Sequence, residues 1–297
     1  MGGLGAFFGL VLAVANRFLK VEEDPRIDAV EEMLPGTNCG ACGQPGCRAF
    51  AEALVGGSEK PSGCTVSSPE GIEDIADFLG VAAGERVKLV ARLHCAGGLG
   101  RAREMADYEG FESCRAAALV AGGGKKCSWG CLGLADCSVV CDFDAIRMND
   151  DRLPVVDPDL CTACGDCVDI CPKDLFDLMP IDEHLIVQCS APVAAEEARA
   201  LCKVACDACG RCAQDAEPGL ITMKGNLPVI DRNSGARETA DATARCPTGA
   251  IAWVTGEQFA GRRFVPLTIS DDPFDRGYEA GLEAGQQTRH GSRKARS

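Results

Sequence analysis

The chain opens with an apolar stretch, continues as short apolar runs between polar and glycine-rich segments, and ends in a polar tail. Residues 1–16 carry no charged side chain, and Arg17 and Lys20 follow at once. Sixteen helical residues span about 24 Å, which is less than the roughly 30 Å hydrocarbon core of a bilayer. Including Phe18 and Leu19, with Arg17 snorkelling to the interface, gives a segment of marginal spanning length.

This stretch predicts an N-terminal membrane anchor at residues 1–20. Its basic residues follow the apolar run, which predicts a protein on the cytoplasmic side of the inner membrane. A signal peptide is one alternative, because Ala13-Val14-Ala15 resembles a cleavage site, although no basic residue precedes the apolar run. A buried helix of a soluble protein is the other alternative.

The short apolar runs predict individual elements. A helix is expected at residues 49–55 and a strand near residues 153–156. Similar strand-like runs precede Cys95, in LHCAGG, and Cys189, in VQCSAP, as if both came from one repeated element. Residues 270–297 lack an apolar period, which is typical of a disordered tail.

Cysteine changes this picture most, because 20 of the 297 residues are Cys. Disulfide scaffolds are usually short secreted chains, whereas 31.1 kDa is long enough for two or three domains. A net charge of −14 argues against a nucleic-acid-binding protein. Three His residues and 5% aromatic residues leave little material for acid–base catalysis or base stacking. The composition therefore indicates bound metal, either zinc or iron–sulfur clusters.

The N-terminal set of cysteines lies in and after LPGTNCGACGQPGC. It comprises Cys39, Cys42, Cys47 and Cys64. The glycines between them let the backbone wrap tightly and aim amide hydrogens at cluster sulfurs. Four thiolates suit zinc or a [4Fe–4S] cube, and the spacing favours the cube.

Residues 161–172 read CTACGDCVDICP and follow the C-x2-C-x2-C-x3-C-P pattern of ferredoxins. Three of these cysteines wrap one cube, and the fourth, before the proline, binds another. A looser copy upstream spaces its cysteines by three, five and three residues and ends in DFDAI. In ferredoxins the arrangement is crossed: the first three cysteines of each motif share a cube with the fourth cysteine of the other motif. This crossed rule predicts a dicluster module with two ligand sets. One set is Cys127, Cys131, Cys137 and Cys171, and the other is Cys161, Cys164, Cys167 and Cys141.

Residues 206–216 read CDACGRCAQDA and repeat the motif with Ala216 in place of the fourth cysteine. Downstream, Cys246 and its proline are retained without the three cysteines expected before them. Under the crossed rule both losses belong to the same cluster. The surviving C-terminal set, Cys206, Cys209, Cys212 and Cys246, predicts a ferredoxin-like module that keeps one cube, with zinc as the alternative.

These assignments use sixteen cysteines and predict four [4Fe–4S] clusters. The four that remain are Cys95, Cys114, Cys189 and Cys202. Buried or free thiols are one interpretation, and a fifth cube bound by all four is the other. A disulfide is disfavoured in a reducing compartment.

No site for substrate chemistry is visible. Gly98-Leu99-Gly100 is followed by Arg103 where a dinucleotide-binding loop has its third glycine. The three histidines, His94, His184 and His290, are scattered and suggest no nucleophilic triad. Lys125 and Lys126 lie beside a predicted cluster ligand, where their charge would tune its potential. The sequence therefore predicts no catalytic residue and a protein that transfers electrons.

The motifs resemble the B subunits of the Rnf complexes, the membrane-bound ferredoxin:NAD oxidoreductases that couple electron flow to ion transport. The resemblance runs from Gly5 to about Val254. It rests on GLGAFFGLVLAVANRF, VEEDPRIDAVEEMLPGTNCGACGQPGC, DYEGFESC and KKCSWGCLGLADC. The anchor is a few residues shorter than is usual for the family, and the second ferredoxin module lacks a cluster that longer members carry.

The resemblance implies a cytoplasm-facing subunit that exchanges electrons with a soluble ferredoxin or a partner subunit. It also implies that the family's cluster ligands correspond to the sixteen cysteines assigned above. A soluble polyferredoxin serving a cytoplasmic oxidoreductase is one alternative. A redox sensor or assembly scaffold is a second, and a cluster-bearing subunit of a corrinoid system is a third, although the chain has no cobamide-binding domain.

Taken together, the sequence predicts an α+β multidomain chain with an N-terminal transmembrane helix. The expected parts are an anchor at 1–20, a four-cysteine domain at 21–85, a connecting segment at 86–126, a dicluster module at 127–185, a single-cluster module at 186–256 and a mostly disordered tail at 257–297.

Overall fold

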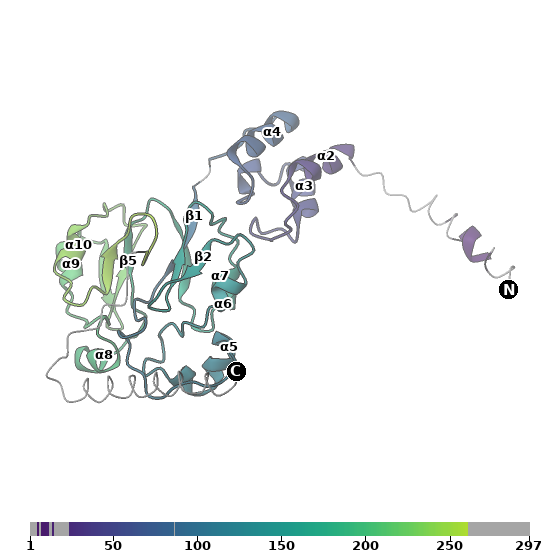
Figure 1. Ribbon diagram of the computed structural model, residues 1–297. Helices are drawn as coiled ribbons and strands as arrows, with labels where there is room; N and C mark the ends of the chain where they lie inside the picture. Colours follow the sequence, from purple (N-terminus) through teal and green to yellow (C-terminus); the bar gives the residue numbers. More distant parts are fainter. Residues whose placement is uncertain (1–4, 6, 12–13, 15–23, 86, 261–297) are drawn as a thin grey trace. The chain divides into compact units, whose positions relative to one another are not determined.

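The computed structural model describes residues 5, 7–11, 14, 24–85 and 87–260 (Figure 1). These residues belong to two compact units. The N-terminal unit contains the chain up to Ala91 and the short segments Cys161–Gly165 and Leu178–Ile181. The C-terminal unit contains Arg92–Leu160, Asp166–Asp177 and the chain from Asp182 onward. Short helices and strands occur throughout, which confirms the predicted mixed α+β class.

The predicted anchor at residues 1–20 lies largely outside the described residues, as does most of the predicted tail at 257–297. Within the part of the chain that the structure describes, no helix has both the length and the apolar character needed to cross a bilayer.

The N-terminal unit is built from helices around a small apolar core. Its elements are α2 (Pro25–Met33), α3 (Cys47–Val55), η1 (Pro61–Gly63) and α4 (Pro69–Leu79). The predicted helix at 49–55 is confirmed as α3, which begins two residues earlier, at Cys47. Ser68 caps α4 by accepting a hydrogen bond from the Gly71 amide at 3.1 Å. The core consists of Val30, Leu34, Phe50, Ala51, Leu54, Cys64 and Ile75.

The C-terminal unit contains most of the strands. Its helices are α5 (Cys114–Leu119), η2 (Ala121–Gly124), α6 (Asp136–Val139), α7 (Asp166–Ile170), α8 (Ala195–Leu201), α9 (Arg211–Asp215) and α10 (Asp241–Ala244). The strands of the chain are β1 (Leu89–Leu93), β2 (Ile146–Met148), β3 (Pro154–Val156), β4 (Phe176–Pro180), β5 (Leu185–Val187), β6 (Ile221–Lys224), β7 (Leu227–Ile230) and β8 (Ile251–Trp253). The strands predicted near 153–156 and before Cys95 and Cys189 are confirmed as β3, β1 and β5.

Each sheet within the described residues has only two strands, paired as β1-β4, β2-β3, β5-β8 and β6-β7. In the antiparallel pair β5-β8, Leu185 lies opposite Trp253 and Val187 opposite Ile251. Figure 1 shows α9 and α10 beside β5, and α6 and α7 beside β2. The core between β5-β8, β6-β7 and α9-α10 includes Leu185, Leu220, Ile221, Ala242 and Ile251. Ala216, the position of the missing cysteine, packs against this core.

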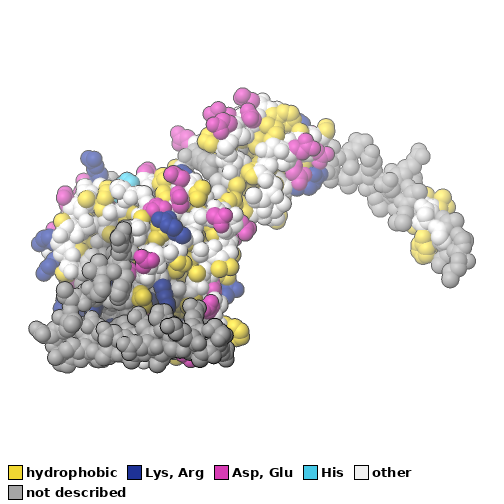
Figure 2. Space-filling model, viewed as in Figure 1, with side chains coloured by type: hydrophobic (Ala, Val, Ile, Leu, Met, Phe, Trp, Pro, Cys, Tyr) yellow, Lys and Arg dark blue, Asp and Glu magenta, His cyan; other side chains and the backbone are white. Residues whose placement is uncertain are grey.

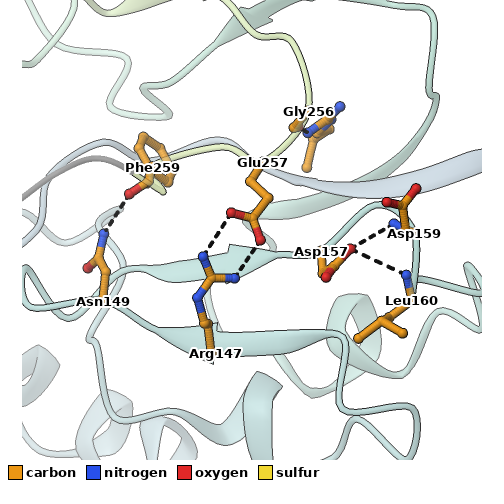
Figure 3. Close-up of polar contacts among 9 residues, drawn as sticks. Arg147, Asn149, Asp157, Asp159, Leu160, Gly256, Glu257 and Phe259 are labelled. Atoms are coloured by element: carbon orange, nitrogen blue, oxygen red, sulfur yellow. Dashed lines mark hydrogen bonds and ion pairs between the residues drawn. The ribbon is translucent and has the colours of Figure 1, made fainter.

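The residues after β8 contact the end of β1 and the β2 region within the C-terminal unit. The buried side chain of Gln258 accepts a hydrogen bond from the Leu93 amide and donates one to the Leu93 carbonyl, both at 2.9 Å. Figure 3 shows Glu257 paired with Arg147 of β2 through two contacts of 2.6 and 2.8 Å. In the same view Asn149 donates to the Phe259 carbonyl at 3.3 Å.

We expect the loss of the Gln258 hydrogen bonds to destabilise the protein more than the loss of the Glu257 ion pair. Gln258→Met keeps the volume but leaves two buried backbone groups of Leu93 unsatisfied, at about 1–3 kcal/mol each. We expect the thermal unfolding midpoint of the cluster-loaded protein to fall by at least about 5 °C. The control Glu257→Gln weakens a solvent-exposed ion pair worth roughly 0–1 kcal/mol and should lower the midpoint by less than about 3 °C. Equal midpoints for the two variants would contradict this account.

Candidate metal centres

The N-terminal set lies at the edge of the core of its unit. Cys64 belongs to that core, and Cys42 and Cys47 pack against it. The Ser67 hydroxyl donates to the Cys64 sulfur at 3.1 Å. Burial raises the pKa of Cys42, and the neighbouring Cys64 and Cys39 raise it further, whereas the Gln44 amide lowers it. Cys39, Cys42 and Cys64 are therefore neighbours, Cys47 packs against the same core, and the binding of one cube by all four remains a prediction.

The loop of this set depends on backbone conformations that favour glycine. Gly40 and Gly43 have φ angles of +73° and +81°. The Cys47 amide donates to the Asn38 side chain at 2.8 Å, and this oxygen would lie 2.8 Å from a Cβ atom at Gly46. The CGACGQPGC segment is therefore fitted closely around its cysteines.

Left-handed residues also occur within both regular ferredoxin motifs. Ala163 and Gly165 have φ angles of +58° and +96°, and Ala208 and Gly210 have φ angles of +55° and +69°. A left-handed alanine is strained, at about 1–3 kcal/mol. Successive amides around such residues form concave nests that bind anions and many iron–sulfur clusters. The two alanines adopt this costly conformation at equivalent positions of the two motifs, where the surrounding amides would be able to bind a cluster.

The structure brings the C-terminal set together. Cys206, Cys209, Cys212 and Cys246 line one cavity of about 300 Å³. Burial raises the pKa of Cys206 to about 11, and the Ala208 amide opposes that rise. The neighbouring thiols that raise the pKa further belong to Cys189, Cys212 and Cys246. The donors and the enclosed space fit a [4Fe–4S] cube.

In the dicluster module, Cys131, Cys137 and Cys171 lie together with a fourth thiol. Burial raises the pKa of Cys137, and its neighbours Cys131, Cys114, Cys167 and Cys171 raise it further. Cys114 begins α5, where burial and the neighbouring Asp136 and Cys171 raise its pKa while the Asp136 and Leu134 amides lower it. The Ser113 hydroxyl and Arg115 amide donate to the Asp136 carboxylate at 3.0 and 3.1 Å, which fixes α5 against α6.

The structure groups Cys127 differently from the crossed prediction. Its pKa is raised by burial and then by Cys95 and Cys189, neither of which belongs to the predicted set. It lines a second cavity, of about 370 Å³, together with Cys95, Cys189 and Cys202. The local sequence signal for this difference is the irregular spacing of three and five residues around Cys131, where a regular motif has two and two.

The remaining predicted ligands lie on the second motif and the loop after α6. Cys167 is buried in α7, Cys161 and Cys164 precede that helix, and Cys141 follows α6. Their grouping around one cube remains a prediction.

The described residues contain no group of three or more His, Cys, Asp or Glu side chains that could hold one metal ion. A cube is bound differently, because each thiolate ligates a different iron.

The ring Nδ1 atoms of His94 and His184 contact the backbone oxygens of Val187 and Val254, at 2.7 and 2.9 Å. Asp and Glu side chains are spread over the visible face of both units (Figure 2). These features suit a cluster-binding protein with an acidic surface.

Comparison with known proteins identifies two iron–sulfur regions and a family. Family models described as an Fe-S cluster and a 4Fe-4S binding domain match residues 34–66 and 153–176. The chain is 40% identical over 252 residues to the B subunit of the Na(+)-translocating ferredoxin:NAD(+) oxidoreductase complex of Acetobacterium woodii, and the match covers 85% of this chain and 75% of that protein. It is 38% identical over 250 residues to the B subunit of the proton-translocating ferredoxin:NAD(+) oxidoreductase complex of Clostridium ljungdahlii, covering 84% and 88% of the two chains. It is 34% identical over 251 residues to the B subunit of the ion-translocating oxidoreductase complex of Methanosarcina acetivorans, covering 84% and 95%. The chain therefore belongs to the family of B subunits of the ion-translocating ferredoxin:NAD oxidoreductases, the Rnf complexes.

Proposed function

We propose that this chain is the iron–sulfur electron-transfer subunit of a membrane-bound, ion-translocating ferredoxin:NAD oxidoreductase. Its partners are a soluble ferredoxin and the other subunits of the complex, and residues 1–20 anchor it with its bulk on the cytoplasmic side. The observation that carries the proposal is the combination of family membership with several sets of thiols held on amide-rich loops.

The chain's own residues prepare each site for a cluster. Buried and partly exposed thiols supply the ligands, and left-handed backbone positions direct amides toward them. The C-terminal set is lined partly by Met223, Pro228 and Ile251, which limit access of water. A bound [4Fe–4S] cube supplies one-electron transfer, at a potential set by hydrogen bonds, charge and exposure.

Lys125 is placed to influence two neighbouring groups of cysteines. Its ammonium group donates to the Gly97 carbonyl at 2.7 Å and to the Cys131 carbonyl. Its charge also lowers the pKa of Cys131 and Cys202, opposing the effects of burial and of Cys95. We propose that this charge raises the reduction potential of the adjacent clusters, because it stabilises added negative charge.

The proposed function predicts that membranes lacking this chain lose ferredoxin-dependent NAD reduction and regain it with the full-length protein. Deletion of residues 1–20 should leave the protein in the soluble fraction and restore less than about a tenth of the activity, because the anchor is lost. NADH oxidation by an artificial acceptor at the NADH-binding subunit is the control and should persist. Full activity without the chain, or removal of the full-length chain by a salt wash, would overturn the proposal.

The crossed ligand rule predicts that Cys171→Ala removes about four irons, those bound with Cys131 and Cys137. Adding Cys137→Ala should remove no further iron, whereas adding Cys167→Ala should remove about four more. Iron and acid-labile sulfide analysis of anaerobically purified protein measures both changes. The opposite result would be a further loss of iron when Cys137→Ala is added to Cys171→Ala and no further loss when Cys167→Ala is added. Cys171 would then belong to the other cluster, and the crossed ligand rule would not hold in this protein.

Replacing Lys125 with Met should lower the midpoint potential of at least one adjacent cluster by tens of millivolts, because a nearby positive charge is lost. Lys125→Arg keeps the charge and should stay closer to the wild-type potential. Potentiometric titration followed by EPR spectroscopy gives both values. An unchanged potential in Lys125→Met would rule out this role.

A further inference from the structure

Four cysteines outside a regular ferredoxin motif line one cavity in the C-terminal unit. They are Cys95, Cys127, Cys189 and Cys202. Cys95, Cys127 and Cys202 are only 7%, 8% and 6% exposed. We call this space the Cys95 cavity.

Backbone hydrogen bonds hold Cys95 and Cys189 beside each other. The two cysteines each lie two residues beyond the end of a strand, β1 and β5 respectively. The Ala96 amide donates to the Gln188 carbonyl at 2.9 Å, and the Ser190 hydroxyl donates to the His94 carbonyl at 2.9 Å. The similar contexts LHCAGG and VQCSAP are thus joined at the edge of this cavity.

Further backbone contacts fix the other two cysteines. Cys202 forms an antiparallel bridge with Ala102, and the Arg103 amide donates to the Leu201 carbonyl at 2.9 Å. The Arg103 carbonyl in turn accepts from the Lys126 amide at 2.8 Å, immediately before Cys127. Residues 102 and 103 therefore contact the chain at Cys202 and just before Cys127, although these two cysteines are far apart in the sequence.

The surroundings are suited to bound thiolates. The Cys95 sulfur accepts hydrogen bonds from the Gly97 and Cys131 amides at 3.4 and 3.3 Å. A Cβ atom at Gly97 would lie 3.2 Å from the Cys202 sulfur and 3.5 Å from the Cys95 sulfur, so glycine leaves room beside both. Lys125 adds a positive charge close by.

The chemistry of the four side chains fits an iron–sulfur cluster, because thiolates are its ligands and iron offsets their mutual repulsion. The C-terminal set, whose motif already predicts a cube, likewise gathers four cysteines around one cavity.

The Cys114 thiol supplies the ligand that the predicted dicluster module then lacks. The residues on either side of Cys114 both donate to Asp136, the residue before Cys137: the Ser113 hydroxyl at 3.0 Å and the Arg115 amide at 3.1 Å. These two contacts hold Cys114 beside Cys137, where it can complete a set with Cys131, Cys137 and Cys171 without Cys127.

We infer that Cys95, Cys127, Cys189 and Cys202 bind a fifth [4Fe–4S] cube, and that Cys114 takes the place of Cys127 beside Cys131, Cys137 and Cys171. The new site adjoins two other sets. The Cys131 amide donates to the Cys95 sulfur, and Ala205, the residue before Cys206, lines the Cys95 cavity. A cube here would provide a redox centre between the dicluster module and the C-terminal set.

Iron counting in the full-length, anaerobically purified protein tests this inference independently of the oxidoreductase function. The wild type should hold about 20 irons and 20 sulfides, and the triple variant Cys95→Ala/Cys189→Ala/Cys202→Ala about 16. Adding Cys127→Ala should cause no further loss, because its cube is already absent. Adding Cys114→Ala should reduce the count to about 12. Val139→Ala, at a side chain of α6 that is 84% exposed, is the control and should keep about 20.

The opposite pattern would overturn the inference: about 16 irons in the wild type, or a further loss with Cys127→Ala and none with Cys114→Ala. Single variants give a second test if the triple variant does not fold. The EPR signal lost in Cys127→Ala should match that lost in Cys95→Ala, and the signal lost in Cys114→Ala should match that lost in Cys171→Ala. A match between Cys127→Ala and Cys171→Ala would also contradict the assignment.

Discussion

Ligation of buried thiolates by iron is the interaction on which the rest of this protein depends. The sheets of the described residues have two strands each, and the helices that carry or adjoin cysteines have four to nine residues. Two-stranded sheets and helices of this length are marginal in water without further support. Buried thiols gathered at the same places are costly to ionise unless a cation binds them. The proposed clusters would therefore stabilise the short helices and strands and also offset the cost of ionising the thiols.

The backbone is shaped for the same interaction. Ala163 and Ala208 adopt left-handed conformations at equivalent positions of two motifs, and glycines occupy the remaining tight positions. Their strain is explained if the amides around them bind a negatively charged cluster. Lys125 and the amides near Cys95 place further positive charge between neighbouring sets. The same groups that stabilise a cluster also set its potential, so stability and electron transfer have a common origin.

Local motifs allowed much of this arrangement to be predicted from the sequence. The C-x2-C-x2-C spacing and its crossed partner predicted the C-terminal set, because the wrapping of a cube requires that spacing, and these four cysteines line one cavity. Short apolar runs located α3, β1, β3 and β5. The different surroundings of Cys114 and Cys127 could not be derived in this way, because they depend on contacts between distant segments, such as Arg103 with Leu201 and Lys126. The local signs of the Cys95 cavity were the likeness of LHCAGG to VQCSAP and the irregular cysteine spacing around Cys131.

The central claim is that the twenty cysteines form five sets of four, one of them around the Cys95 cavity. The most direct measurement is anomalous scattering at the iron absorption edge from crystals of the loaded, full-length protein. The account predicts five cluster positions, with one bounded by Cys95, Cys127, Cys189 and Cys202. Four positions with no iron in that cavity, or iron bonded to Cys127 together with Cys131 and Cys137, would contradict it.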